Sequence, residues 1–383
     1  MPLFVLAHFG HHIISAMLRP LLPMIRTDLG LSYTQAGLIM SAFAMTSGVS
    51  QLPAGWLADR FGARLMVLLG VTGVAIAGFL IGLSYSYSAL IVFLVLAAIV
   101  GGGYHPASAA AISSSVPSEY RGRALGLHFV GGSSAFWVMP LVAAPIAVAW
   151  GWRSSYLTLA IPAIILGILL YILIGRWSQT RVQDFQEVDS EVTITTARVP
   201  WHKLVPFILI SVATGTMIQS ISAYLSLYAV DEIGVSEAAA AMLMAITPAV
   251  GFFAAPVGGY LADRFGSMPV LLVISFLAIP LVYLLGVVTS IIAFAVLMVA
   301  IGIVSSARIP SSESYIAGNT PKRRRATVLG LYFFAGTEVA GLLTPVVGIL
   351  IDRLGFYSSF TIVSASMAAV VVVCSLFLWR HWK

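Results

Sequence analysis

The sequence predicts an all-α polytopic membrane protein with twelve transmembrane helices in two pseudo-symmetric halves of six helices each. Composition, the number of long apolar runs and an internal repeat predict this fold class. Hydrophobic residues make up 60% of the 383 residues and charged residues only 9%, whereas a soluble domain has about 25% charged residues. With a mean hydropathy of +1.00, the chain is expected to fold in a lipid bilayer.

The apolar runs give the expected helices in order. The hydrocarbon core of a bilayer is about 30 Å thick, so each crossing needs about 20 apolar residues. Because each run is continuously apolar, the alternating strands of a barrel are excluded. The runs lie near 3–25, 33–58, 65–83, 88–113, 124–149 and 155–175, and again near 203–229, 236–262, 268–287, 291–316, 326–350 and 357–379.

An internal repeat relates the two sets of helices. Gly-Trp-Leu-Ala-Asp-Arg-Phe-Gly at 55–62 returns as Gly-Tyr-Leu-Ala-Asp-Arg-Phe-Gly at 259–266, a displacement of 204 residues. The same displacement carries Pro106 onto Pro310. A duplicated polytopic protein is most often a transporter with its substrate site between the halves. We therefore expect a first half over 1–177, a hydrophilic cytoplasmic linker over 178–202 and a second half over 203–383.

Basic residues set the expected orientation. With both termini in the cytoplasm, most loop Lys and Arg residues lie inside and only Arg26, Arg153 and Arg353 lie in outer loops, as the positive-inside rule requires. This asymmetry also accounts for the formal net charge of +6 without a nucleic-acid partner. We expect a multi-pass protein of the cell inner membrane that is monomeric and contacts membrane lipids.

The repeated octapeptide predicts a gate at the cytoplasmic ends of the second and eighth helices. Asp59 and Asp263 can accept hydrogen bonds from the amides at a neighbouring helix start. Arg60 and Arg264 can contact carbonyl ends or lipid phosphates. Together with Arg64, these residues are expected to hold the cytoplasmic side shut in one conformation. The alternative is a turn that only follows the positive-inside rule.

The segment Gly55–Arg64 is similar to the signature loop of the major facilitator superfamily. The chain resembles that family over nearly its whole length. The first half is most similar to the fosmidomycin-resistance efflux group. The supporting residues are His8, the segment 21–37, Tyr104-His-Pro106 and Phe129-Val-Gly-Gly132 followed by Pro140. The sequence departs from the antiporter pattern at Ala107, where an acid is expected, and at Ala135 and Met139, where glycines are expected.

The resemblance implies that the first, fourth, seventh and tenth helices line a central cavity. Polar residues on these helices are functional candidates, because a charge in hydrocarbon costs at least about 2.5–3.5 kcal/mol. The expected substrate-binding residues are Arg19, Tyr104, His105, Gln219, Tyr224 and Arg308.

Arg19 and Arg308 form the most informative pair, with one arginine in each half. A guanidinium stays charged when buried, so two of them across a wet cavity would bind a carboxylate, phosphonate or phosphate. The alternatives are that Arg19 extends to the membrane surface, and that Arg308 forms an ion pair with Glu338.

Glu338 and His105 are the candidates for proton coupling. Glu338 lies near the middle of its helix, and His105 has an ordinary pKa near 6.5 and a place in the expected cavity. The alternative for Glu338 is a permanent ion pair, and for His105 a structural histidine.

A metal or cofactor is not expected. His8, His11 and His12 share one helical face at i, i+3 and i+4, which could bind a transition metal. No cysteine or carboxylate joins them locally, and a permanent ion would obstruct alternating access.

The sequence therefore predicts a secondary active transporter for a small anionic organic solute, working by alternating access with proton-coupled efflux. An organic-anion uptake carrier or exchanger without proton coupling is the alternative. An ATP-driven pump is disfavoured because the chain has no phosphate-binding Gly-x-x-x-x-Gly-Lys-Ser/Thr loop. An enzyme is disfavoured because no catalytic motif is present, and a channel because matched gates favour two-state access.

Overall fold

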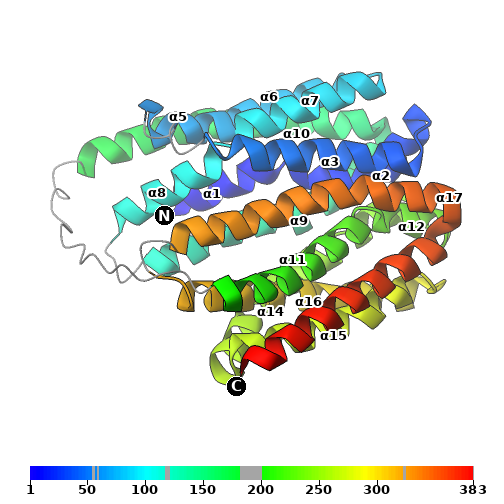
Figure 1. The fold of residues 1–383 in the computed structure, drawn as a ribbon. Coiled ribbons are helices and arrows are strands. Elements are labelled where there is room, and N and C mark those ends of the chain that lie inside the picture. The colour runs from blue at the N-terminus through cyan, green and yellow to red at the C-terminus, as the bar shows by residue number, and fades with distance from the viewer. Residues whose placement is uncertain (54–56, 58–59, 117–120, 182–200, 322–324, 383) are drawn as a thin grey trace.

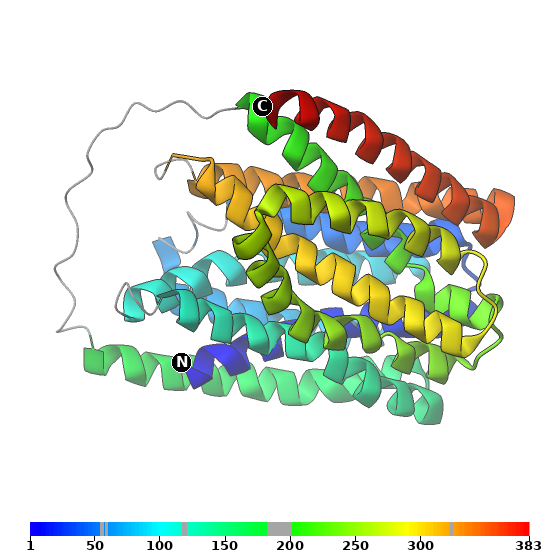
Figure 2. The same ribbon diagram turned by 90° about the horizontal axis from the view of Figure 1, so that it is seen from below.

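A computed structural model describes residues 1–53, 57, 60–116, 121–181, 201–321 and 325–382. This part of the chain is helical and contains no strand. The helix axes are roughly aligned, the chain passes back and forth along them, and both termini lie toward the same end of the molecule (Figures 1 and 2).

Several of the predicted crossings are interrupted, and each interruption separates two shorter helices. The first half contains α1 (Pro2–His12), α2 (Ser15–Leu29), α3 (Tyr33–Ser50), α5 (Ala63–Leu68), the π-helix η1 (Leu69–Gly73), α6 (Val74–Gly82), α7 (Tyr87–Gly101), α8 (Tyr104–Ser115), α9 (Arg121–Trp150) and α10 (Trp152–Arg181). The second half contains α11 (Trp201–Ser222), α12 (Leu225–Asp231), α13 (Glu237–Leu243), α14 (Ile246–Phe265), α15 (Ser267–Leu285), α16 (Ile291–Gly318) and α17 (Arg325–Trp382).

The helices account for the predicted crossings. Among the described residues, nine helices are long and apolar enough to cross a membrane. One of them merges two crossings, because α17 changes direction at Gly355, where φ is 75°. With the two limbs of α17 counted separately and with α1–α2 and α3 added, the arrangement is consistent with twelve crossings.

The backbone repeats with the same displacement as the sequence. The six described glycines with positive φ fall into three pairs separated by 204 residues, which are Gly30 and Gly234, Gly62 and Gly266, and Gly151 and Gly355. Each of these glycines lies between two successive helical segments, at a positive φ that glycine alone adopts without strain.

Helix starts repeat as well. Ser32 caps α3 by accepting the N–H of Gln35, and Ser236 caps α13 by accepting the N–H of Ala239. Each serine thereby satisfies one of the free amides of a helix start.

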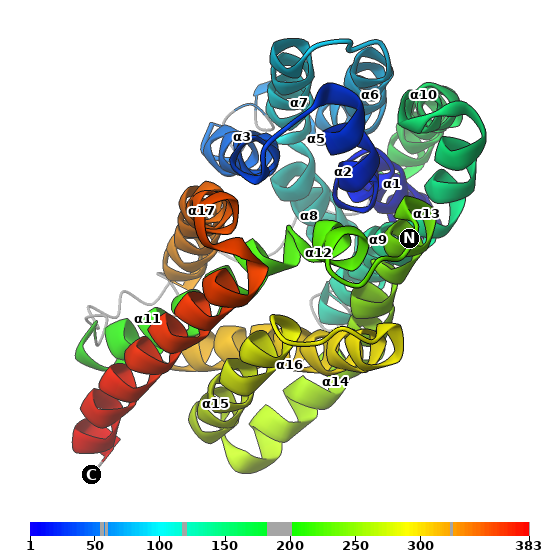
Figure 3. The same ribbon diagram turned by 90° about the vertical axis from the view of Figure 1, so that its right-hand side faces the viewer.

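The two groups of helices pack against each other along three seams (Figure 3). In these seams α3 packs against α17, α2 against α12 and α13, and α9 against α13 and α14. Leu22 and Ala36 of the first half are fully buried in the hydrophobic cluster that the second half forms. Apolar burial therefore continues across the interface between the halves.

Polar contacts between the halves gather at the end of the molecule away from the termini, which we call the closed end (residues 26–34, 231–237 and 352–356). Arg26 Nη1 donates to Asp231 Oδ2 at 2.8 Å, and the Tyr33 hydroxyl donates to the same oxygen at 2.6 Å. The Thr27 hydroxyl donates to Glu237 at 2.9 Å.

Asp352 makes the most specific contact at the closed end. Its carboxylate accepts the backbone N–H groups of Tyr33 at 2.9 Å and Thr34 at 2.8 Å, as well as the Thr34 hydroxyl. A side chain from the second half thus supplies a negative charge to the N-terminus of α3, where unpaired amides and the helix dipole favour an anion.

Candidate functional site

A cavity of about 510 Å³ lies between the two halves. The first half contributes His12, Arg19, Phe43 and His105 to its wall, and the second half contributes Gln219, Thr247 and Thr337. Two interruptions position the residues of the first half. One separates α1 from α2 just after His12, and the other separates α7 from α8 just before Tyr104.

Arg19 lies in the wall of this cavity on α2. Its Nε is buried and has no hydrogen-bond partner, and no ion pair involves its guanidinium among the described residues. The Arg19 carbonyl accepts the hydroxyl of Ser226 at 2.9 Å, which ties α2 to α12. The backbone is therefore anchored across the interface while the charge remains without a counter-ion.

Arg308 on α16 lines a second cavity of about 180 Å³. Its Nη1 donates to the carbonyl of Ser211 at 3.0 Å, to the Ser211 hydroxyl at 2.9 Å and to the Tyr332 hydroxyl at 2.8 Å. Its Nε is buried without a partner. The guanidinium packs against Gly215, where a side chain would collide with it. Neutral groups hold Arg308 in place, and no described carboxylate forms an ion pair with it, although Glu313 on the same helix is close enough to interact with its charge.

The possible ion pair between Arg308 and Glu338 does not occur in this structure. Among the described residues Arg308 contacts hydroxyl and carbonyl oxygens but no carboxylate. Glu338 of α17 packs instead against Gly48 of α3, where its Oε1 is buried without a hydrogen-bond partner.

The two cavities share Gln219 and Thr337 in their walls. Gln219 has an exposed side chain that faces both cavities. No described aspartate or glutamate lines either cavity. Arg19 and Arg308 therefore face adjoining spaces that contain cationic groups and neutral polar groups but no described carboxylate.

Tyr104 and Tyr224, both expected at the substrate, are fully buried and line neither cavity. Tyr104 stacks on His11 with ring centroids 4.3 Å apart. The Tyr224 hydroxyl donates to the carbonyl of Thr344 at 2.7 Å and lies 3.3 Å from the carbonyl of Tyr33. In this conformation both tyrosines position other elements rather than face the cavity.

The histidines of the first half gather beside the cavity. His11 donates from Nδ1 to the carbonyl of Gly70 at 2.7 Å. Gly70 belongs to η1, and a π-helical turn is common at functional sites because it changes the backbone hydrogen-bonding pattern. His105 lines the cavity, as expected, and its ring lies 5.2 Å from that of His8 and 5.4 Å from that of His12.

Two of the expected gate residues, Arg64 and Arg264, make hydrogen bonds within their own halves. Arg64 donates to the Tyr171 carbonyl at 2.8 Å and covers the ring of that tyrosine at 3.8 Å. Arg264 donates to the hydroxyl of Tyr260 one turn earlier. Arg60 lies over the ring of the adjacent phenylalanine, and Asp263 is exposed. Asp59 lies outside the described residues, so the gate stays a prediction.

Sequence reasoning missed the polar residues that hold Arg308. Ser211 and Tyr332 contact it directly, and Ser312 lies 2.6 Å from the Ser211 hydroxyl. A signal was present on α11, where Ser211, Gly215 and Gln219 recur every four residues and so share one face. All three now lie against Arg308 or line its cavity.

A family model described as Major Facilitator Superfamily matches residues 4–291 and 207–381. The probable sulfoacetate transporter SauU of Cupriavidus necator is 29% identical, and the match covers 93% of this chain and 87% of SauU. The multidrug resistance protein MdtG of Salmonella paratyphi C is 26% identical, with 96% and 91% covered.

Solved structures share the fold. A POT family transporter in complex with 5-aminolevulinic acid has a TM-score of 0.84 at 15% identity, over 100% of this chain and 96% of that one. A bacterial homologue of the human lysosomal transporter Spinster, in an inward-facing and occupied conformation, has a TM-score of 0.76 at 18% identity, over 99% and 95%. At these identities the likeness shows the fold alone.

The family match confirms the predicted resemblance and the all-α membrane fold. The finer resemblance to the fosmidomycin-resistance group stays a prediction. Relatives that match nearly the whole chain are transporters rather than enzymes. The chain is a multi-pass membrane protein that belongs to the major facilitator superfamily.

Proposed function

We propose that this protein is a secondary active transporter whose substrate is a small organic anion. One observation carries the proposal: Arg19 and Arg308, one from each half, face adjoining cavities, and neither has an ionic partner among the described residues. Arginine does not lose its proton in proteins, so an anionic solute is the natural partner for these charges.

The chemistry of the cavities favours short acids. A guanidinium binds carboxylates, sulfonates and phosphates through paired, charge-assisted hydrogen bonds. A cavity of about 510 Å³ falls within the usual range for small-molecule sites. The similarity to a probable sulfoacetate transporter supports the same class, because sulfoacetate carries one carboxylate and one sulfonate.

Transport would proceed by alternating access. The structure holds the halves together at the closed end through Arg26, Asp231 and Asp352, so the opposite conformation requires these contacts to break. The direction we propose is proton-coupled efflux across the inner membrane, with both termini cytoplasmic. Similarity to a multidrug resistance protein supports efflux, and the buried, unpartnered Oε1 of Glu338 supports proton coupling.

An exchanger without proton coupling is the second candidate. The observation that favours it is that no described carboxylate lines either cavity. Such a carrier would exchange one organic anion for another, with no proton bound at Glu338.

Counterflow in proteoliposomes tests the proposal. Vesicles loaded with unlabelled sulfoacetate or with a short dicarboxylate are diluted into a trace of the same solute in labelled form. A carrier accumulates the label transiently, because each export of an unlabelled anion leaves the binding site facing outward, where it can bind a labelled anion and carry it into the vesicle. A channel dissipates the gradient without accumulation, and a cationic solute as the only active substrate would contradict the anion proposal.

We predict that Asp352→Asn weakens the closed end. An amide has one acceptor oxygen where the carboxylate has two, and hydrogen bonds to charged groups contribute about 1.5–3 kcal/mol. The fraction of molecules open at this end should rise roughly tenfold. To measure this, Cys374 is replaced by alanine and Ser222, which lines the cavity, is replaced by cysteine. An impermeant maleimide is added at the closed end, and the rate at which it labels the new cysteine reports how often that end opens.

Asp28→Asn is the matched control. Asp28 accepts from Arg153 at 2.6 Å and from Trp152 at 3.2 Å, so its carboxylate is also held by several hydrogen bonds, but entirely within the first half. Its loss should leave the labelling rate within about twofold of the parent, a ratio that corresponds to only about 0.4 kcal/mol. Equal labelling rates in the two variants would show that Asp352 does not hold the halves together.

A further inference from the structure

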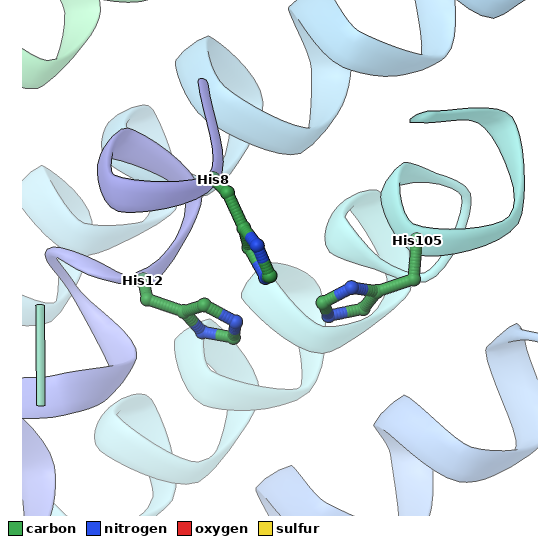
Figure 4. A group of neighbouring side chains, drawn as sticks. All are labelled: His8, His12 and His105. Atoms are coloured by element: carbon green, nitrogen blue, oxygen red, sulfur yellow. The ribbon is translucent and has the colours of Figure 1, made fainter. Parts of the chain in front are cut away.

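The histidine cluster beside the cavity has a geometry that substrate contact does not explain. His8 and His12 project from α1 and His105 from α8, and their rings point toward one another (Figure 4). One ring nitrogen from each of the three lies within 4.8 Å of the others. No other group of this kind occurs among the described residues.

Hydrogen bonds leave a free nitrogen on His8 and His12, the two α1 histidines of this group. His8 Nδ1 lies 2.8 Å from the carbonyl oxygen of His128. Because a carbonyl only accepts, Nδ1 must carry the hydrogen and Nε2 must keep its lone pair. His12 Nδ1 lies 3.1 Å from the Ser15 hydroxyl, which in turn donates to the His12 carbonyl at 3.4 Å. When the Ser15 hydroxyl donates to this carbonyl, His12 carries its hydrogen on Nδ1 and keeps the lone pair of Nε2.

These are the outer contacts that metal-binding histidines ordinarily make. A ligating imidazole usually donates its second N–H to a carboxylate, a backbone carbonyl or water, which fixes both the tautomer and the ring orientation, and His8 makes such a contact with the His128 carbonyl. His8 is fixed further, because it stacks on His128 at 4.2 Å and packs against Gly132, where a side chain would collide with the ring. The His105 ring has no hydrogen-bond partner among the described residues.

We propose that His8, His12 and His105 bind one divalent transition ion of the zinc class. Three neutral imidazoles suit such ions, and a tetrahedral ion with three protein ligands keeps its fourth position open. His12 and His105 line the large cavity, so the open position faces it. Zinc–nitrogen bonds of about 2.0–2.1 Å require the rings to approach by about 1 Å.

The ion would not obstruct alternating access. All three ligands come from the first half, so the ion does not link that half to the other and the site persists in both conformations. His11 is not part of it, because the group of ring nitrogens within 4.8 Å of one another contains His8, His12 and His105 only, while the His11 ring faces the Gly70 carbonyl and stacks on Tyr104. The set of ligands therefore differs from the i, i+3, i+4 set on one helix that the sequence offered.

The open position would add a binding group to the cavity. A water molecule or an anionic oxygen can complete the coordination, as in catalytic zinc sites. Arg19 lines the same cavity as His12 and His105, so the ion and the guanidinium would face the same space. The metal site itself does not rest on the proposed function, because the ion can bind without any solute.

Zinc binding to the purified full-length chain tests the proposal. The protein carries an affinity tag without histidine and is studied in detergent micelles by isothermal titration calorimetry. We expect one zinc ion per chain. Cobalt(II) should bind in its place, with the intense visible absorption of a tetrahedral ion. Single replacements His8→Gln, His12→Gln and His105→Gln should each weaken binding at least tenfold, as even loss of an outer contact does.

Two variants serve as controls. His202→Gln removes an exposed histidine at the start of α11, and His11→Asn removes the neighbouring histidine outside the site. Both should bind zinc within about twofold of the parent, and size-exclusion profiles check that each variant folds. If His8→Gln does not fold, His12→Gln and His105→Gln decide. No zinc bound to the parent, or equal weakening by His202→Gln, overturns the proposal, whatever the transport assays show.

Discussion

Replacing Arg308 by alanine is expected to weaken binding of the transported anion roughly ten- to hundredfold, and Arg19→Ala should do the same. A hydrogen bond to a charged group contributes about 1.5–3 kcal/mol, and each 1.4 kcal/mol is about tenfold in affinity. Both guanidinium groups face cavities without an ionic partner among the described residues. The dissociation constant of the solute identified by counterflow, measured by calorimetry, checks both changes.

Lysine should restore binding only in part at either position. It carries the same charge but lacks the planar fork that pairs with an oxyanion. Tyr332→Phe offers a finer test, because it keeps Arg308 but removes a hydroxyl that holds Nη1 at 2.8 Å. We expect a smaller loss of affinity, with Arg308 less well oriented.

Arg153→Ala is the matched control for the arginine variants. Arg153 is paired with Asp28 within the first half and lines neither cavity. Its loss removes one positive charge from the protein without changing the cavities, so binding should be unaffected. Normal transport of an anion by both Arg19→Ala and Arg308→Ala would refute the proposed binding site.

Much of the fold could be predicted because its signals are periodic or repeated. Long apolar runs follow directly from the thickness of the bilayer. The displacement of 204 residues read from residues 55–62 and 259–266 also relates the paired positive-φ glycines, such as Gly151 and Gly355. Local backbone geometry therefore repeats with the sequence.

The rotation of each helix about its own axis could not be predicted with the same reliability. Tyr104 precedes His105, yet Tyr104 is fully buried while His105 lines the cavity. The difference arises because neighbouring residues on a helix point about 100° apart, and the sequence of one helix does not show which face meets the cavity. The same limit explains Tyr224, whose hydroxyl joins α3 to α17.

Contacts between distant helices were also beyond the sequence. Glu338 and Arg308 looked like possible partners, but the carboxylate faces Gly48 and the guanidinium faces Ser211. A glycine at position 48 leaves room for the carboxylate, and a glycine at position 215 leaves room for the guanidinium. Small residues thus decide where the charges lie, but they become informative only when the facing helix is known.

Glu338→Gln is expected to abolish accumulation driven by a pH gradient while preserving exchange of the transported anion. Glu338 lies at the seam between α3 and α17, with Oε1 buried and unpartnered. The side chain is half-buried, and burial of one oxygen without a hydrogen bond disfavours the ionised form. Ser47, next to Gly48, and Thr337, next to Glu338, line the large cavity, so the carboxylate lies close to the cavity wall.

The substitution separates two steps of the transport cycle. Glutamine keeps the size of the side chain but cannot release a proton, so the loaded carrier can still change conformation while net coupled movement stops. Uphill transport and counterflow are measured on the same proteoliposomes, with Glu232→Gln, an exposed glutamate at the closed end, as the control. Full uphill transport by Glu338→Gln would exclude this residue as the proton carrier. A parent protein that ignores the pH gradient would instead favour the anion exchanger, because proton and substrate affinities must be linked in any coupled carrier.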